Sequence, residues 1–355
     1  MNNSTDSKLP GKSIRTLFCA GMLFLTLLVP GQFSPVQAAE APHAVVLMYH
    51  RFDEGTLPST NIRLDQLDAH IQELKSGGFT VWPLNRIVDH LKAGTVLPDR
   101  TIAITIDDAY ASVFHKAWPQ FQAAGFPFTV FVSTGQVGRS SNYLTWDQIR
   151  TMRNSGVLIG HHGAAHAHMA KASPLAVRAD FKRANKAFKA GLGRLPEIFA
   201  YPYGEASNAL QQLVKEQGFK AAFGQHSGVA NAYDAPLYLP RFAMSETYGT
   251  MDRFKLAANA LPIPVKDVSP SDMLVNDNPP AYGFTLALPV PGFKNLNCFA
   301  SHIGASVRTE HLGPTRVEVR FKQPFPPGRS RINCTLRDAD GRWRWLGRLF
   351  YLPKK

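Results

Sequence analysis

Short apolar runs alternate with amphipathic segments along the first two thirds of the chain. Residues 43–50 (HAVVLMYH) and 101–107 (TIAITID) have the length and the β-branched content of buried strands. Residues 64–78 instead carry leucine and isoleucine at helical spacing and end in two glycines, as a helix does. Further strands are expected at residues 127–133, 156–162, 197–202, 219–225 and 239–244, and further helices at residues 111–124, 145–154, 174–192 and 206–217. This alternation predicts an α/β fold whose parallel sheet is covered by helices, either a barrel or a doubly wound sheet.

The pattern changes after residue 260. Residues 261–280 are rich in proline, and we interpret them as a linker that follows the α/β domain at residues 39–260. Residues 281–355 then show period-two segments with turn signals such as DADG between them. These segments are expected at residues 283–290, 315–322, 330–338 and 342–352. They predict a small all-β, sandwich-like domain at the C-terminal end.

The N-terminal segment has the features of an export signal. Lys12 and Arg15 precede an apolar run, and Val36 and Ala38 fit a cleavage site of small residues. Residues 1–38 are therefore expected to be a signal peptide, with the protein exported to the periplasm or the extracellular space. The alternative is an uncleaved membrane anchor, although the apolar run is shorter than the roughly 20 residues that a membrane span needs.

Cysteines and charge add to this picture. Cys298 and Cys334 are the two cysteines beyond the signal segment, and in an exported protein we expect them to form a disulfide. Two buried free thiols are the alternative. The formal net charge of +13 over 355 residues points to anionic partners. Export argues against nucleic acid and for anionic polymers of the cell envelope or matrix.

Two aspartates stand side by side at the end of the strand predicted at residues 101–107. Burial of one unpaired carboxylate costs several kcal/mol, and Asp108 next to Asp107 adds repulsion. A metal cation is therefore the first compensating charge to expect.

Histidines gather after the strand predicted at residues 156–162. His161, His162, His166 and His168 fall close together directly after an apolar run. Imidazole and carboxylate ligands together suit Zn²⁺ or a similar divalent ion, and three protein ligands with an open position mark a catalytic site. The alternative is a solvated loop that happens to be rich in histidine.

Other polar residues also follow predicted strands, namely His50, residues 201–204 (YPYG) and His226. The C-terminal ends of parallel strands meet at one end of a barrel, which is where active sites form. A lone histidine at a strand end is more often a hydrogen-bonded structural group, but together these positions predict a site.

Three of these segments resemble the motifs of the polysaccharide deacetylases, also called carbohydrate esterase family 4 or the NodB homology domain. TIDDAY at residues 105–110 and HHGAAH at residues 161–166 resemble the first two motifs, and FAYPYG at residues 199–204 is similar to the third. The resemblance covers residues 43–250. An early MYH at residues 48–50 is similar to the poly-N-acetylglucosamine deacetylase branch.

The resemblance implies a role for each matching residue. Asp107 matches the catalytic base, Asp108, His162 and His166 match the metal ligands, and Tyr203 matches the residue whose backbone N–H helps to hold the oxyanion. It also implies a distorted parallel (β/α) barrel and a divalent metal, with Zn²⁺ expected, that activates water and polarises an acetyl carbonyl. The implied reaction removes acetyl groups from N-acetylglucosamine units of an exopolysaccharide or peptidoglycan.

The chain also departs from the family pattern. Ala200 replaces the arginine that braces the base, and neither the fourth motif nor the late Leu-x-x-His is found. We expect Arg241 to brace Asp107 instead and His226 to serve as the general acid. Because motifs are missing, an O-acetyl esterase and a catalytically silent saccharide-binding protein stay open as alternatives.

The C-terminal domain combines two tryptophans with many arginines. Trp343 and Trp345 are two residues apart and so lie on the same side of a strand. They could stack on sugar rings while arginines bind acidic groups of an envelope polymer. The alternative is that the tryptophans fill the core or dock the domain against the barrel. The arginines are Arg316, Arg320, Arg329, Arg331, Arg337, Arg342, Arg344 and Arg348.

Overall fold

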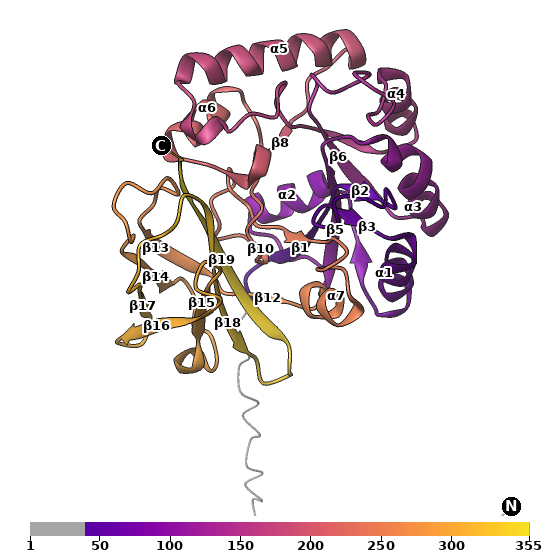
Figure 1. Ribbon diagram of the computed structural model, residues 1–355. Coiled ribbons are helices and arrows are strands. Elements are labelled where there is room, and N and C mark those ends of the chain that lie inside the picture. Colours follow the sequence, from indigo (N-terminus) through magenta and orange to yellow (C-terminus); the bar gives the residue numbers. More distant parts are fainter. Residues whose placement is uncertain (1–39, 355) are drawn as a thin grey trace, which may run out of the picture. The chain divides into compact units, whose positions relative to one another are not determined.

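The structure, a computed structural model, describes residues 40–354 (Figure 1). The predicted signal peptide, residues 1–38, lies outside the described residues. Within the described range, no helix combines the length and the hydropathy that crossing a membrane requires.

The first sheet has nine strands and is parallel except at one edge. Its main order is β10-β1-β5-β6-β7-β8-β9, with β11 also paired to β1 and β4 to β5, and only β10 runs antiparallel. The strands are β1 (His43–Tyr49), β4 (Thr80–Val81), β5 (Thr101–Asp107), β6 (Phe128–Val132), β7 (Leu158–His161), β8 (Ile198–Ala200), β9 (Ala221–Phe223), β10 (Ala230–Asn231) and β11 (Phe242–Ala243). This is the predicted α/β fold with a parallel barrel-like sheet.

Helices cover both faces of this sheet because its strands are apolar on both sides (Figure 1). In β1, Val45 and Leu47 belong to one buried cluster while Ala44 and Val46 belong to another. The helices are α1 (Leu64–Ser76), α2 (Leu84–Ala93), α3 (Trp118–Ala124), α4 (Trp146–Asn154), α5 (Pro174–Leu192), α6 (Asn208–Glu216) and α7 (Met251–Ala258), with shorter turns η1 (Val113–Ala117), η2 (Met169–Lys171), η3 (Pro202–Gly204) and η4 (Phe293–Asn295).

The second sheet has eight strands in the order β12-β19-β18-β15-β16-β17-β14-β13. All neighbours pair antiparallel except β12 and β19. The strands are β12 (Leu261–Pro262), β13 (Val265–Ser269), β14 (Tyr282–Leu286), β15 (Asn297–Ala300), β16 (Ala305–Leu312), β17 (Arg316–Arg320), β18 (Gly328–Arg337) and β19 (Trp343–Leu352), while β2 (Arg51–Phe52) and β3 (Asn61–Ile62) pair separately. The C-terminal part is thus all-β as predicted, and the Pro-rich passage contributes two strands to it.

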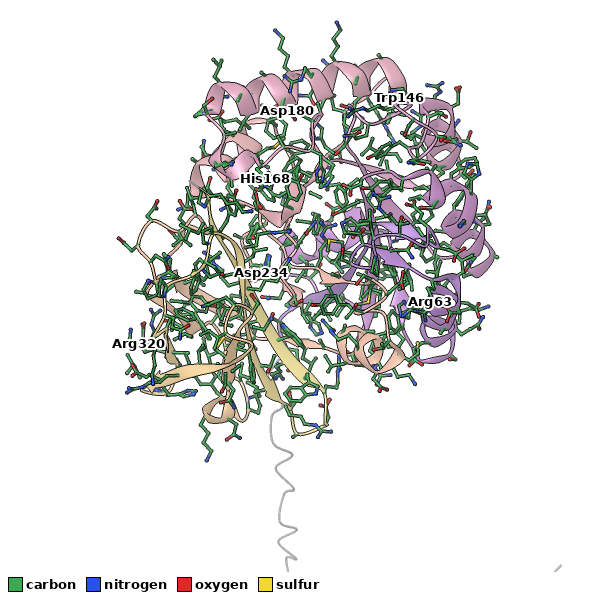
Figure 2. The ribbon with its side chains drawn as sticks, in the orientation of Figure 1. Arg63, Trp146, His168, Asp180, Asp234 and Arg320 are labelled. Atoms are coloured by element: carbon green, nitrogen blue, oxygen red, sulfur yellow. A yellow bond between two sulfur atoms is a disulfide. The ribbon has the colours of Figure 1, made fainter. Side chains whose placement is uncertain are left out.

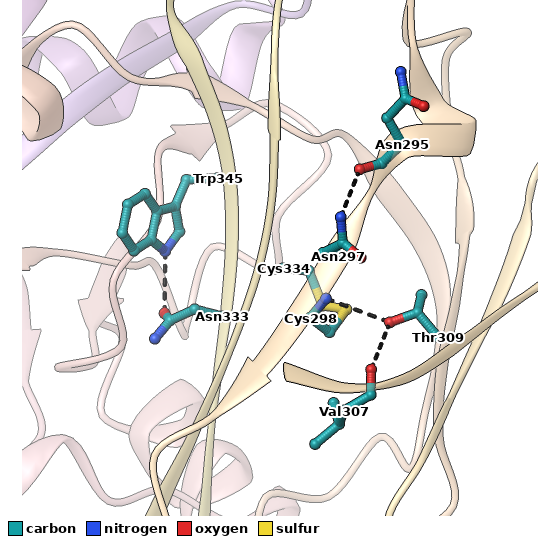
Figure 3. The surroundings of a disulfide bond; sticks show 8 residues. All are labelled: Asn295, Asn297, Cys298, Val307, Thr309, Asn333, Cys334 and Trp345. Atoms are coloured by element: carbon teal, nitrogen blue, oxygen red, sulfur yellow. Dashed lines mark hydrogen bonds between the residues drawn. A yellow bond between two sulfur atoms is a disulfide. The ribbon is translucent and has the colours of Figure 1, made fainter. Parts of the chain in front are cut away.

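A disulfide joins two paired strands of the second sheet (Figure 3). Cys298 on β15 lies directly opposite Cys334 on β18, and both are fully buried. The Cys298 N–H also donates to Thr309 Oγ1 on β16 at 3.3 Å. The predicted disulfide is therefore present in the structure and lies in the core of the sheet.

Strand β19 docks the second sheet against the barrel. Trp345 packs edge-on against Phe242 of β11, and its Nε1 donates to Asn333 Oδ1 at 3.0 Å (Figure 3). Farther along β19, a side chain on Gly347 would overlap the Ser227 carbonyl, so only glycine allows this approach. Trp345 thus docks the second sheet against the barrel, which was the alternative to sugar binding, whereas the Trp343 side chain is 37% exposed.

Several arginines of the second sheet already have acidic partners. These ion pairs join Arg316 to Glu318, Arg320 to Glu310, Arg342 to Asp99, and Arg344 to both Glu40 and Asp338. Their charge is consequently compensated within the chain, which weakens the idea that they collectively bind an acidic polymer.

Candidate active site

Asp107 is the last residue of β5, and its carboxylate is fully buried. Arg241, also fully buried, donates from one guanidinium nitrogen to Oδ1 and from another to Oδ2, each at 2.7 Å. The same guanidinium donates to Thr105 Oγ1 and to the Gly224 carbonyl, which fixes its orientation. Arg241 therefore braces Asp107, as the sequence led us to expect.

The charge of Arg241 controls the protonation of Asp107. Burial by itself raises the pKa of the carboxyl group, but the nearby positive charge, above all that of Arg241, outweighs burial and holds the pKa below its usual value. Asp107 is consequently a carboxylate at neutral pH and is able to accept a proton.

Asp108, His162 and His166 form a cluster whose ligand atoms all lie within 4.8 Å of one another. Asp108 Oδ1 is 3.3 Å from His162 Nε2 and 3.0 Å from His166 Nε2. Asp108 follows β5 and the two histidines follow β7, so parallel strands deliver all three to the same end of the sheet. The structure thus brings together the three residues that the resemblance implied as metal ligands.

The donor atoms of this cluster fit a divalent metal ion. Within the described residues, Asp108 Oδ1 and His162 Nε2 are buried without a hydrogen-bond partner, which is costly unless a cation lies between them. The Ala200 carbonyl lies 2.7 Å from His162 Nδ1 and can only accept, so Nδ1 carries the proton and Nε2 keeps its lone pair. Metal-binding histidines are commonly oriented in this way.

Asp180 on α5 shapes the segment that carries His166 (Figure 2). Its side chain is buried, and its carboxylate accepts hydrogen bonds from the backbone N–H groups of Ala164 at 2.7 Å and Ala165 at 3.0 Å. Sequence reasoning missed this residue. The available signal was an aspartate on the apolar face of an amphipathic helix.

Tyr203 lies beside the cluster, in the turn η3 after β8. Its backbone has φ +60° and ψ 2°, a left-handed conformation that residues other than glycine seldom adopt. Its ring meets the His166 ring edge-on at 4.5 Å and stacks on His168 at 4.0 Å. The turn therefore places the Tyr203 ring beside His166 of the cluster.

A family model described as polysaccharide deacetylase matches residues 95–222. That range contains both aspartates, both histidines of the cluster and Tyr203. Residues 95–222 therefore form a polysaccharide deacetylase domain. This confirms the assignment made from the sequence, and with it that the protein is a hydrolase acting on carbon–nitrogen bonds outside peptides.

Relatives of the chain support the same family. The poly-β-1,6-N-acetyl-D-glucosamine N-deacetylase of Staphylococcus aureus is 22% identical over 233 residues, 57% of this chain and 79% of that protein. Among solved structures, IcaB from Ammonifex degensii is 28% identical with a TM-score of 0.55, covering 62% of this chain and 98% of its own. The Streptococcus pyogenes deacetylase PplD, in complex with acetate, shares the fold at 21% identity and a TM-score of 0.54, covering 58% of this chain and 93% of its own.

His226 does not join the metal cluster of this deacetylase. It lines a cavity of about 330 Å³ together with Asp234, Tyr238 and Arg348, and within the described residues this lining includes neither Asp107 nor the cluster. Burial and the Arg348 charge lower the pKa of His226 to about 3, so the ring is neutral at working pH. Because β9 ends three residues before His226, the strand does not carry this side chain to the site as we expected.

His50 lies near Asp107. It follows β1, which pairs with β5, and its Nε2 is 3.9 Å from Asp107 Oδ2. Burial lowers the pKa of His50, and the charges of Asp107 and Asp108 oppose this effect only in part. His50 is therefore an imidazole outside the metal cluster that faces the carboxylate pair.

The remaining histidines of the deacetylase motif have other partners. His161 is fully buried among phenylalanine rings, the Gly163 N–H donates to its Nδ1 at 3.0 Å, and burial lowers its pKa to about 3. His168 Nδ1 is 2.7 Å from a carboxylate oxygen of Glu205. Neither ring contributes to the cluster of possible ligands.

Proposed function

We propose that this protein is an exported, metal-dependent N-deacetylase that acts on a polysaccharide containing N-acetylglucosamine. The observation that carries the proposal is a buried, arginine-held carboxylate next to a carboxylate and two histidines suited to a metal. The S. aureus relative is named for poly-β-1,6-N-acetyl-D-glucosamine. We therefore favour an exopolysaccharide of this kind as substrate, with peptidoglycan as the other candidate.

Each residue has a chemical step that its position allows. Asp107 accepts a proton from the water that attacks the acetyl carbon, and the Tyr203 N–H donates to the developing oxyanion. His50, 3.9 Å from Asp107, relays the proton that Asp107 took from the water to the leaving nitrogen as the C–N bond breaks, which returns Asp107 to the carboxylate. Asp108 and the two histidines would hold a metal ion, proposed to be Zn²⁺, which when bound supplies a Lewis acid that polarises the carbonyl and lowers the pKa of water.

Acetate release tests this proposal. The purified protein is incubated with poly-β-1,6-N-acetylglucosamine, chito-oligomers, peptidoglycan and acetylxylan, with chelator and after Zn²⁺ is restored. Release from an N-acetylated substrate should disappear with chelator and in Asp107→Asn. Release from acetylxylan alone would identify an O-acetyl esterase instead. Saccharide binding without any release would identify a silent binding protein.

The proton donor is tested by two histidine variants. His50→Ala should slow turnover by about 10² or more, since a positioned acid contributes 10² to 10⁴. His226→Ala should retain turnover, because its ring faces the cavity that Arg348 also lines. The reverse result would return the role of the acid to His226.

Two observations support the proposal that the protein is exported. Residues 1–38 have the features of a signal peptide, and the second sheet contains a disulfide. A disulfide between Cys298 and Cys334 suits an oxidising space outside the cytoplasm. The net charge of +13 would favour retention near anionic envelope polymers. Cell fractionation and N-terminal sequencing of the exported form test this, and a full-length cytoplasmic product would contradict it.

A further inference from the structure

The turn that carries Tyr203 is held by residues of the second sheet. Arg329 on β18 donates from a guanidinium nitrogen to the Tyr203 carbonyl oxygen at 3.1 Å. The same guanidinium carbon lies 5.7 Å from the centre of the Tyr203 ring. Strand β18, which begins more than a hundred residues after Tyr203, therefore forms a hydrogen bond with the Tyr203 backbone.

Tyr203 needs such support because its backbone is strained. Its φ of +60° is a conformation that costs a residue with a side chain free energy unless the surroundings enforce it. An arginine on the carbonyl restricts rotation of the following peptide. The Tyr203 conformation is thus tied to the second sheet.

Aromatic stacking adds a second link between the two parts. The His168 ring lies parallel to Tyr203 at 4.0 Å and parallel to Tyr351 of β19 at 6.3 Å. Glu205, which is 2% exposed, fixes His168 through the 2.7 Å contact to Nδ1 and lies 3.9 Å from Arg329 Nε. These residues form one contact network that ends at the edge of the His166 ring.

We propose that Arg329 is a positioning residue for the deacetylation site and that the second sheet is part of the catalytic unit. This inference rests on the proposed function. Arg329 does not touch reacting atoms. It holds Tyr203 so that the backbone N–H points at the developing oxyanion, and a donor displaced from that direction loses its effect on the transition state.

The strand offers a matched control. Arg337 lies on the same strand and, eight residues away, on the same side of the sheet as Arg329. Its guanidinium Nε donates to the Gly341 carbonyl within its own hairpin, 3.3 Å away. Arg337→Ala removes the same charge from the same face without touching Tyr203.

The test compares Arg329→Ala, Arg329→Lys and Arg337→Ala in the full protein. For Arg329→Ala we expect kcat to fall about tenfold or more while KM and the Zn²⁺ dissociation constant stay within about twofold. Arg329→Lys should recover part of kcat, because an ammonium group can donate to the same carbonyl. Arg337→Ala should match the wild type. Equal kcat in Arg329→Ala and Arg337→Ala, or a loss confined to KM, overturns the proposal.

A second measurement separates this inference from the proposed function. Amide hydrogen exchange of metal-free protein should speed up at residues 203–205 in Arg329→Ala by about tenfold, and not in Arg337→Ala. This outcome requires no turnover, so it stands even if no substrate releases acetate. Unchanged exchange at these amides would show that Arg329 does not hold the turn.

Discussion

Replacement of Arg241 by glutamine tests whether one buried ion pair maintains both the charge of the base and the stability of the barrel. Glutamine removes the positive charge while it keeps a polar side chain. The variant loses two hydrogen bonds of 2.7 Å to Asp107, and both partners are 0% exposed, so water cannot replace the lost donors. Removal of one partner from such a pair costs about 3–5 kcal/mol. That is a large share of the 5–15 kcal/mol that stabilises a typical domain.

The same variant should change the pH dependence of catalysis. Burial raises the pKa of Asp107 and Arg241 counteracts it, so the folded-state pKa moves upward when the guanidinium is removed. A base must be ionised to work, and the acid limb of kcat/KM should therefore move to higher pH. In the wild type the pKa of Asp107 is lower in the folded state than in the unfolded state. The stability that the Asp107 carboxylate contributes is therefore present above its unfolded-state pKa and is lost as pH falls through its folded-state pKa.

Two assays and a matched variant decide the outcome. Denaturant unfolding measures the loss of stability, and kcat/KM measured against pH locates the acid limb. Arg344→Gln is the control, because Arg344 of β19 is 3% exposed and is paired with Glu40 and Asp338, away from Asp107. Arg344→Gln should lose stability without a shift in the acid limb of the kcat/KM profile. If the acid limb of Arg241→Gln is also unshifted, Arg241 does not set the pKa of Asp107.

Three further predictions follow from the site and the barrel. Asp107→Asn should retain bound metal while kcat falls by at least about 10², whereas Asp108→Ala should also lose metal, as elemental analysis will show. Asp180→Asn should weaken Zn²⁺ affinity about tenfold in a competition titration, because the loop of His166 loses a charged acceptor. Burial lowers the pKa of His70 to about 4, so between about pH 6.5 and pH 4 the unfolded state takes up a proton that the folded state refuses. This shift of about 2.5 units should cost metal-free protein about 3 kcal/mol on acidification, and His70→Gln should lack that component in denaturant unfolding.

Local signals were enough to predict much of the barrel. Helix α5 spans Pro174–Leu192, the range predicted, because Ser173 caps its start and Gly193 ends it in a left-handed conformation. Helix α2 was missed although Leu84, Ile87, Val88 and Leu91 all lie on its buried face at helical spacing. That signal was present and was not used.

The Pro-rich passage illustrates how composition can mislead. Prolines at residues 261–280 were interpreted as a linker, yet β12 and β13 lie in this passage. Both are edge strands of the second sheet. Proline lacks an N–H to donate, which excludes it from central strands but leaves edge strands open to it. A Pro-rich segment beside a β domain is therefore compatible with edge strands.

Some residues of the candidate site could be predicted from the sequence and others could not. Asp107, Asp108, His162 and His166 were predictable as a group, because parallel strands end at one edge of a sheet and each residue follows such a strand. The place of His226 was not predictable, because β9 ends at Phe223, three residues before it, and His226 lines a cavity that does not include the cluster. Contacts of Asp180 with a loop backbone carry no local signal of comparable strength.

The absence of the bracing arginine from the third motif is explained by the order of the strands. Arg241 directly precedes β11, which pairs with β1, and β1 pairs with β5, so the guanidinium reaches Asp107 across the sheet. At the usual position, Ala200 instead offers its carbonyl to His162. One buried carboxylate has two oxygens, and Arg241 already occupies both. A second arginine at position 200 would lack a counter-charge there and would pay the desolvation cost of a buried cation. Arg241 therefore takes the place of the arginine that the third motif lacks, and Asp107 keeps its charge despite the departure from the motif.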